Sequence, residues 1–132
     1  MDAVFADTFY FLALLNERDA AHDKATQFGV SSPSLVTTAW VLTEVADAFS
    51  MPENRSAFLE LLDTLKGSPD VRIVGPGAEL FNRGIDLFRQ RSDKERSLTD
   101  CISFVTMADA GIPDALTGDR HFEQAGFRAL LK

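Results

Sequence analysis

The chain has 132 residues, of which 45% are hydrophobic and 25% are charged, as expected for one globular domain. We therefore expect a single domain over residues 1–132. The formal net charge of −7 is the wrong sign for a protein that holds nucleic acid through a broad basic surface. It suits an acidic protein that binds cations or a basic partner segment.

No apolar stretch approaches the ~20 residues of a membrane span, and the start, Met1-Asp2-Ala3, lacks the basic region of a signal peptide. The single cysteine, Cys101, has no partner for an internal disulfide and is expected in the core. These features predict a cytoplasmic protein that makes no membrane contact.

The first half of the chain alternates short apolar runs with helical segments. Residues 3–6 predict a strand, and residues 9–15 predict a buried helix. Asp7 stands between them, either as the helix N-cap or as a site residue at the end of the strand. A helix over 20–28, a loop over 29–34, a strand over 35–38 and a helix over 39–49 follow. Glu44 lies at the edge of the last helix's apolar arc, as a solvated residue or a second site residue.

The middle of the chain continues the same alternation. We predict a helix over 55–66, a strand over 71–74 and a helix over 78–89. The last of these is expected to turn four apolar side chains inward: Leu80, Phe81, Ile85 and Phe88. A basic segment follows, with Arg89, Arg91, Lys94 and Arg96. It is either a solvated loop or a rim that guides phosphate groups.

The segment from Ser97 to Phe122 contains the most informative anomaly. A helix from 98 to 110 is expected to expose a polar stripe of Thr99, Ser103, Thr106 and Ala110. Asp100 falls instead on the apolar arc, where an unpaired carboxylate is costly. Either Asp100 completes a capping box with Ser97, or it binds a cation. A short strand over 114–117 then leads into a loop with Asp119, and a helical turn over 120–124 and an edge strand over 127–131 end the chain.

Alternating strands and helices predict a three-layer α/β/α sandwich around a mostly parallel central sheet of four to five strands. In such a sheet Asp7, Glu44, Asp100 and Asp119 can converge at the carboxyl edge. Crowded carboxylates repel one another unless a cation bridges them, and oxygen ligands favour Mg²⁺ or Mn²⁺. This arrangement suits metal-assisted hydrolysis of a phosphodiester. No serine-histidine-aspartate motif, phosphate-binding loop or dinucleotide-binding glycine pattern is recognisable.

At these positions the chain resembles a known family. Asp7-Thr8, Glu44, Ser97-Leu98-Thr99-Asp100 and the 116–122 segment look like the acidic motifs of PIN-domain ribonucleases. In length and motif order the chain is similar to VapC-type toxins of bacterial toxin–antitoxin pairs. The resemblance implies a Mg²⁺- or Mn²⁺-dependent endoribonuclease with Asp7, Glu44, Asp100 and Asp119 as its catalytic, metal-binding residues. It also implies a homodimer restrained by a cognate antitoxin.

Two alternatives to the ribonuclease interpretation stay open at this stage. The chain could be a PIN-like module that keeps the acidic pocket but acts through a protein partner. It could also be a metal-dependent phosphatase, since an aspartate after the first strand suits phosphoryl transfer, although no Asp-x-Asp pair follows that strand.

Overall fold

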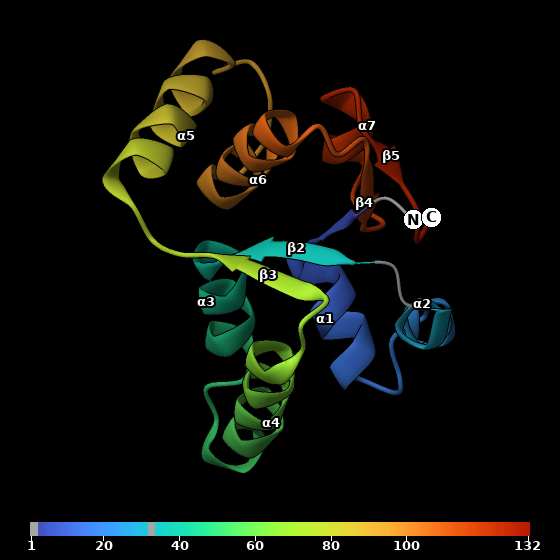
Figure 1. The fold of residues 1–132 in the computed structure, drawn as a ribbon. Coiled ribbons are helices and arrows are strands. Elements are labelled where there is room, and N and C mark those ends of the chain that lie inside the picture. The colour runs from blue at the N-terminus through green and yellow to red at the C-terminus, as the bar shows by residue number, and fades with distance from the viewer. Residues whose placement is uncertain (1–2, 32–33) are drawn as a thin grey trace.

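The computed structural model describes residues 3–31 and 34–132 and consists of a central sheet covered by helices on both faces (Figure 1). The strands are β1 (Val4–Ala6), β2 (Leu35–Thr38), β3 (Val71–Val74), β4 (Asp114–Leu116) and β5 (Arg128–Ala129). The α-helices are α1 (Thr8–Leu15), α2 (His22–Ser31), α3 (Ala39–Ala48), α4 (Arg55–Gly67), α5 (Ala78–Gln90), α6 (Leu98–Ala110) and α7 (Arg120–Gln124), and one 3₁₀ turn covers Pro52–Asn54.

The five strands are all parallel, in the order β3-β2-β1-β4-β5. This confirms the predicted three-layer sandwich with a parallel sheet. From β1 the chain moves outward through β2 to β3, and then crosses back to β4 on the other side of β1. The carboxyl ends of β1 and β4 therefore flank the point where the strand order reverses, which is where open α/β sheets bind their ligands.

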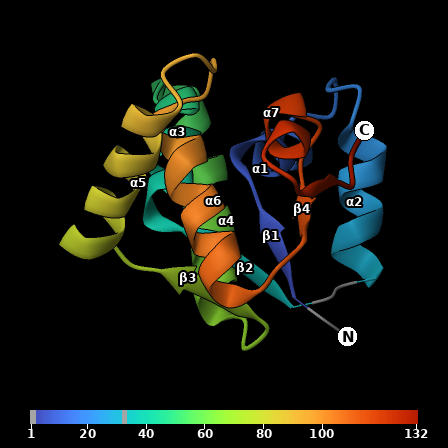
Figure 2. The same cartoon turned by 90° about the horizontal axis from the view of Figure 1, so that it is seen from above.

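The helices form two layers. Helices α1, α3 and α4 cover one face of the sheet, while α5 and α6 lie on the opposite face (Figure 1). In the turned view α5 and α6 run side by side across that face (Figure 2). No helix of the described residues is both long and apolar enough to cross a membrane.

The core lies around the two central strands. Phe5, Ala6, Ala115 and Leu116 are completely buried, as expected for parallel strands that are covered on both faces. This explains why residues 3–6 read as a continuous apolar run instead of an alternating one. Because these strands are rigidly packed, their carboxyl ends are fixed points from which side chains can be positioned.

The expected polar stripe on α6 is wrong at two positions. Ser103 is completely buried and Thr106 is 6% exposed. Helix α6 lies between the sheet and its neighbours, with α5 running beside it (Figure 2). Each hydroxyl donates to a carbonyl one turn earlier, at 3.0 Å from Thr99 and 2.8 Å from Ile102. These bonds satisfy the hydroxyls in a buried position, so a polar residue there does not indicate exposure.

The apolar face of α5 also differs from the prediction. Phe81 is 39% exposed and Phe88 is 47% exposed, whereas both were expected inside. The buried residue of this helix is Gly84, which lies so close to Ile102 of α6 that an added Cβ would overlap its side chain. The predicted loop over 29–34 is wrong at its start, because α2 continues to Ser31; residues 32–33 lie outside the described residues.

Candidate active site

The candidate site lies at the carboxyl ends of β1 and β4. Asp7 follows β1 directly, and Thr117 follows β4. The Thr117 hydroxyl donates to Asp7 Oδ2 at 2.8 Å, which ties the two strand ends together. Asp7 occupies the N-cap position of α1, but its side chain makes no capping hydrogen bond. The capping interpretation of this carboxylate is therefore wrong.

Asp7 is a buried acid, with only 4% of its surface exposed. Burial raises its pKa to about 7 from the ordinary 3.8, and the charges of Asp100 and Asp119 act in the same direction. The hydrogen bond from Thr117 lowers the pKa and offsets part of this effect. Strong perturbation by burial together with neighbouring charge is typical of functional carboxylates.

Asp100 is both a helix cap and a neighbour of the other acids. Its amide donates to Ser97 Oγ at 3.0 Å, and its Oδ2 accepts from the Ser97 amide at 3.4 Å, which completes the capping box. Burial raises the pKa of Asp100 to about 6, and the charges of Asp119 and Glu44 contribute. The capping box and the acidic site, the two interpretations of Asp100 made from the sequence, are therefore compatible. The capping bonds leave the Asp100 carboxylate near those of Asp7, Asp119 and Glu44, and these four acids are called the acidic cluster below.

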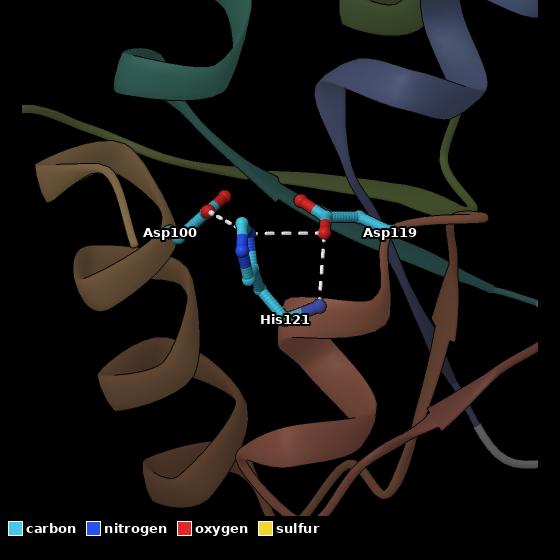
Figure 3. Close-up of side chains that lie close together, drawn as sticks. All are labelled: Asp100, Asp119 and His121. Atoms are coloured by element: carbon cyan, nitrogen blue, oxygen red, sulfur yellow. Dashed lines mark hydrogen bonds and ion pairs between the residues drawn. The ribbon is translucent and has the colours of Figure 1, made fainter. Parts of the chain in front are cut away.

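Asp119 begins α7 and is held by its own loop. Its amide donates to Thr117 Oγ1 at 3.0 Å, and its Oδ1 accepts from the amide of His121 at 2.9 Å. The His121 ring turns back toward the acids, with Nδ1 at 3.1 Å from Asp119 Oδ1 and 3.8 Å from Asp100 Oδ2 (Figure 3). Ligand atoms of Asp100, Asp119 and His121 all lie within 4.8 Å of one another.

His121 was not among the site residues predicted from the sequence. Its side chain is only 22% exposed. The signal was its place two residues after Asp119, in the first turn of the short helix that Asp119 caps. A side chain in that first turn can lie beside the capping carboxylate.

Glu44 lies at the margin of the cluster, half-buried on α3. It accepts a hydrogen bond from Thr8 Oγ1 at 2.5 Å, which links α3 to the start of α1. Its negative charge also raises the pKa of Asp100. The structure thus brings ligand atoms of Asp100, Asp119 and His121 together, and Asp7 and Glu44 lie near enough to interact with these acids through their charges.

Gly118 allows the loop that carries Asp119 to pack closely against α1. A Cβ at this position would lie 2.5 Å from Cζ of the Phe9 ring, 3.0 Å from Cε2 and 3.1 Å from Cε1. Such distances are far inside van der Waals contact, so a larger residue would displace the loop or the ring. The glycine is therefore required by space.

The donor set fits a divalent cation. Burial and mutual repulsion raise the pKa values of Asp7 and Asp100, so a cation bound among them would favour their ionised forms. Carboxylate oxygens are the ligands that Mg²⁺ and Mn²⁺ prefer, and the imidazole of His121 adds a nitrogen donor that Mn²⁺ accepts more readily than Mg²⁺.

Comparisons with known proteins agree with this geometry. The PIN domain family matches residues 4–128. The chain is 30% identical over 125 residues to the 23S rRNA-specific endonuclease VapC20 of Mycobacterium tuberculosis, covering 94% of this chain and 95% of that protein.

Two solved structures are similar to this chain in fold. The crystal structure of Mycobacterium tuberculosis VapC20, described as a sarcin-ricin loop cleaving toxin, superposes with a TM-score of 0.84 at 28% identity, covering 94% of this chain and 95% of the other. FitAcB from Neisseria gonorrhoeae superposes with a TM-score of 0.65 at 16% identity, covering 96% and 94%, which supports the fold alone. The chain belongs to the PIN-domain family and is similar to VapC-type ribonuclease toxins.

Proposed function

We propose that this protein is a divalent-metal-dependent endoribonuclease that hydrolyses RNA phosphodiester bonds as the toxin of a toxin–antitoxin pair. The observation that carries the proposal is the meeting of Asp7, Asp100 and Asp119 at the strand-order reversal, with Glu44 beside them. The family membership and the similarity to an RNA endonuclease support the same activity.

In this proposal Asp7, Asp100, Asp119 and Glu44 hold Mg²⁺ or Mn²⁺, and His121 lies within reach of the same ion. A divalent cation in this position supplies Lewis-acid activation of water and neutralises negative charge at the phosphodiester. Thr117 holds Asp7 in place and favours its ionised form through the hydrogen bond to Oδ2. The amide of His121 holds the Asp119 carboxylate toward Asp100 (Figure 3).

The substrate that we propose is a small structured RNA. The formal net charge of −7 disfavours binding of arbitrary RNA through a broad basic surface. The relative in Mycobacterium tuberculosis is named for cleavage of 23S rRNA and of the sarcin-ricin loop, so a stem-loop from that region is the first substrate to test.

We further propose two protein contacts for this chain in the cytoplasm. An antitoxin with a basic segment would complement the acidic cluster. A second copy of the chain would cover the exposed ring of Phe81 on α5, because large apolar side chains left in solvent often mark interfaces.

The activity is tested with purified protein, a labelled stem-loop RNA, and Mg²⁺ or Mn²⁺. Asp100→Asn keeps the size of the side chain and removes its charge, and we expect cleavage to fall at least ~100-fold. Asp63→Asn on the exposed face of α4 is the matched control and should cleave as the wild type does. Equal cleavage by the wild type and Asp100→Asn would refute catalysis at this site. Tight antitoxin binding without any cleavage would favour a protein-interaction module.

A further inference from the structure

Beside the acidic cluster, the segment between α5 and α6 forms a pocket of opposite charge. The pocket has a volume of about 730 Å³, and its charged lining residues are Arg89, Arg91, Lys94, Glu95 and Arg96. Positive charge therefore prevails locally in a chain whose formal net charge is −7. Such a local reversal of charge attracts an anionic group to this side of the molecule.

Arg96 is the unusual member of this pocket because it is buried, with only 9% of its surface exposed. Its Nε and Nη2 atoms have no hydrogen-bond partner among the described residues. The guanidinium lies over the ring of Phe104, 5.3 Å from the centroid. The ring offers the guanidinium no hydrogen-bond acceptor, so these two buried N–H donors remain unsatisfied, while Arg96 as a residue lies in the lining of the pocket. Buried donors without acceptors are costly, and a planar pair of N–H groups matches the oxygens of a phosphate.

The pocket adjoins the acidic cluster through one residue. Ser97 lines the pocket, and its amide donates to Asp100 Oδ2 at 3.4 Å. The start of α6 therefore separates the cationic pocket from the carboxylates by a single capping box. An RNA strand with a phosphate in the pocket therefore lies against the first turn of α6, which carries Asp100.

An exposed aromatic ring favours RNA over an acidic protein segment, and two weak ion pairs leave arginines available. Phe88 lines the pocket and is 47% exposed, which offers an aromatic ring beside the cations. Cations combined with an exposed aromatic ring are the usual means of holding single-stranded RNA, by phosphate contact and base stacking. The ion pairs of Arg89 with Asp86 at 3.8 Å and of Arg91 with Asp93 at 3.4 Å are exposed. Such pairs are weak, so both arginines can turn to a phosphate.

We propose that this pocket binds a backbone phosphate of the RNA next to the phosphodiester that is cleaved, with Arg96 as the principal donor. The proposal rests on the proposed function, because it assigns the place of the RNA backbone relative to the acidic cluster. Arg96 acts here as a substrate-positioning residue, and Lys94 adds charge at the exposed side of the pocket.

The test measures RNA binding separately from cleavage. Fluorescence anisotropy of a labelled stem-loop RNA in EDTA gives the dissociation constant over a range of salt concentrations. We expect Arg96→Gln to weaken binding at least ~10-fold and to reduce the slope of log K against log salt by about 0.7, the value for one phosphate contact on a single strand. Arg18→Gln, at an exposed position outside the pocket, should change neither quantity.

Lys94→Gln is the second variant, since its exposed side chain can be changed without disturbing the core. We expect a smaller loss of affinity with a reduced salt slope, and this result carries the test if Arg96→Gln fails to fold. Both variants binding RNA as Arg18→Gln does would overturn the proposal.

The outcomes separate this proposal from the nuclease activity. Metal-dependent cleavage by the wild type, with RNA binding that is insensitive to Arg96 and Lys94, refutes the pocket and leaves the nuclease intact. RNA binding that depends on Arg96 without any cleavage supports the pocket and refutes catalysis. A wild-type protein that binds no RNA in this assay refutes the pocket.

Discussion

Asp7 is a carboxyl group whose burial disfavours the ionised form that it would take in water at neutral pH. Burial raises its pKa to about 7, so near neutral pH the metal-free protein holds a proton there that the unfolded chain has released. Between the unfolded pKa of 3.8 and the folded value, the folded state binds more protons than the unfolded state. The free energy of unfolding must therefore decrease as pH rises through this window.

We expect the metal-free protein to lose on the order of 1–4 kcal/mol of stability between about pH 4 and pH 8 through this group. Asp7→Asn cannot ionise, so the variant should lose the Asp7 part of the pH dependence, while the part from Asp100, whose pKa is raised to about 6, remains. Thermal unfolding in EDTA across this pH range, with Asp63→Asn as the control, measures both effects. A Tm of the wild type that rises from pH 5 to about pH 8 would contradict the argument.

The residue scale also shows where sequence reasoning reached its limit. Asp7 and Asp119 could be placed at the sheet edge because each follows a strand, and that relation needs only the order of elements. The direction of the His121 ring and the burial of Arg96 could not be predicted, although Arg96 belongs to the basic segment for which a phosphate-guiding rim was one interpretation. The direction of the His121 ring depends on Asp119 and Asp100, and the burial of Arg96 depends on Phe104, which are tertiary contacts that no local pattern contains.

At the scale of elements, the loop between β4 and α7 depends on Gly118. We expect Gly118→Ala to displace Asp119, because the added methyl would overlap the ring of Phe9. The affinity for Mn²⁺ should fall ~10–100-fold while the fold is kept, as for other losses of support around metal ligands. Isothermal titration calorimetry measures the affinity, and circular dichroism checks the fold.

Adding Phe9→Ala to Gly118→Ala should recover part of the lost Mn²⁺ affinity, since the smaller side chain frees the space. The single variant Phe9→Ala completes the double-mutant cycle. Wild-type affinity in Gly118→Ala alone would show that the close approach to α1 does not position Asp119.

The close packing of α5 against α6 likewise leaves no room for a side chain at Gly84. An added Cβ would overlap Ile102, so we expect Gly84→Ala to lower the free energy of unfolding by about 1–3 kcal/mol despite the better helix propensity of alanine. Gly67→Ala is the matched control, because nothing lies within 4 Å of a Cβ there. Urea denaturation measures both variants. Equal stability of the two would mean that α5 and α6 have room to separate without cost.

The element boundaries show what periodicity can and cannot predict. The strands β1 to β3 were predicted closely. Of these, β1 is a continuous buried apolar run, as expected for a central parallel strand, whereas β2 ends in two buried threonines and β3 is a partly exposed edge strand. The faces of α5 and α6 were predicted less well. Ser103 and Thr106 are buried, and Phe81 and Phe88 remain exposed on α5, whose close approach to α6 is made at Gly84. The hydrophobic pattern of a helix does not by itself predict which element packs against which of its faces.

At the scale of the whole molecule, the parallel order of strands explains the site. Reversal of the strand order between β1 and β4 brings Asp7 and Asp119 to one edge, and the crossover through α5 and α6 returns Asp100 to the same place. The topology thus concentrates negative charge at one point and leaves the basic segment just before α6 beside it. An acidic protein can in this way have both a cation site and a place for RNA.

The anomalous scattering of Mn²⁺ in crystals of the protein tests most directly whether the acidic cluster binds the metal. We expect an anomalous peak between the carboxylates of Asp7, Asp100 and Asp119 in the wild type, and we expect this peak to be absent from crystals of Asp100→Asn. A Mn²⁺-dependent ribonuclease whose crystals show no peak there, or a peak only elsewhere, would contradict the assignment of this cluster as the metal centre.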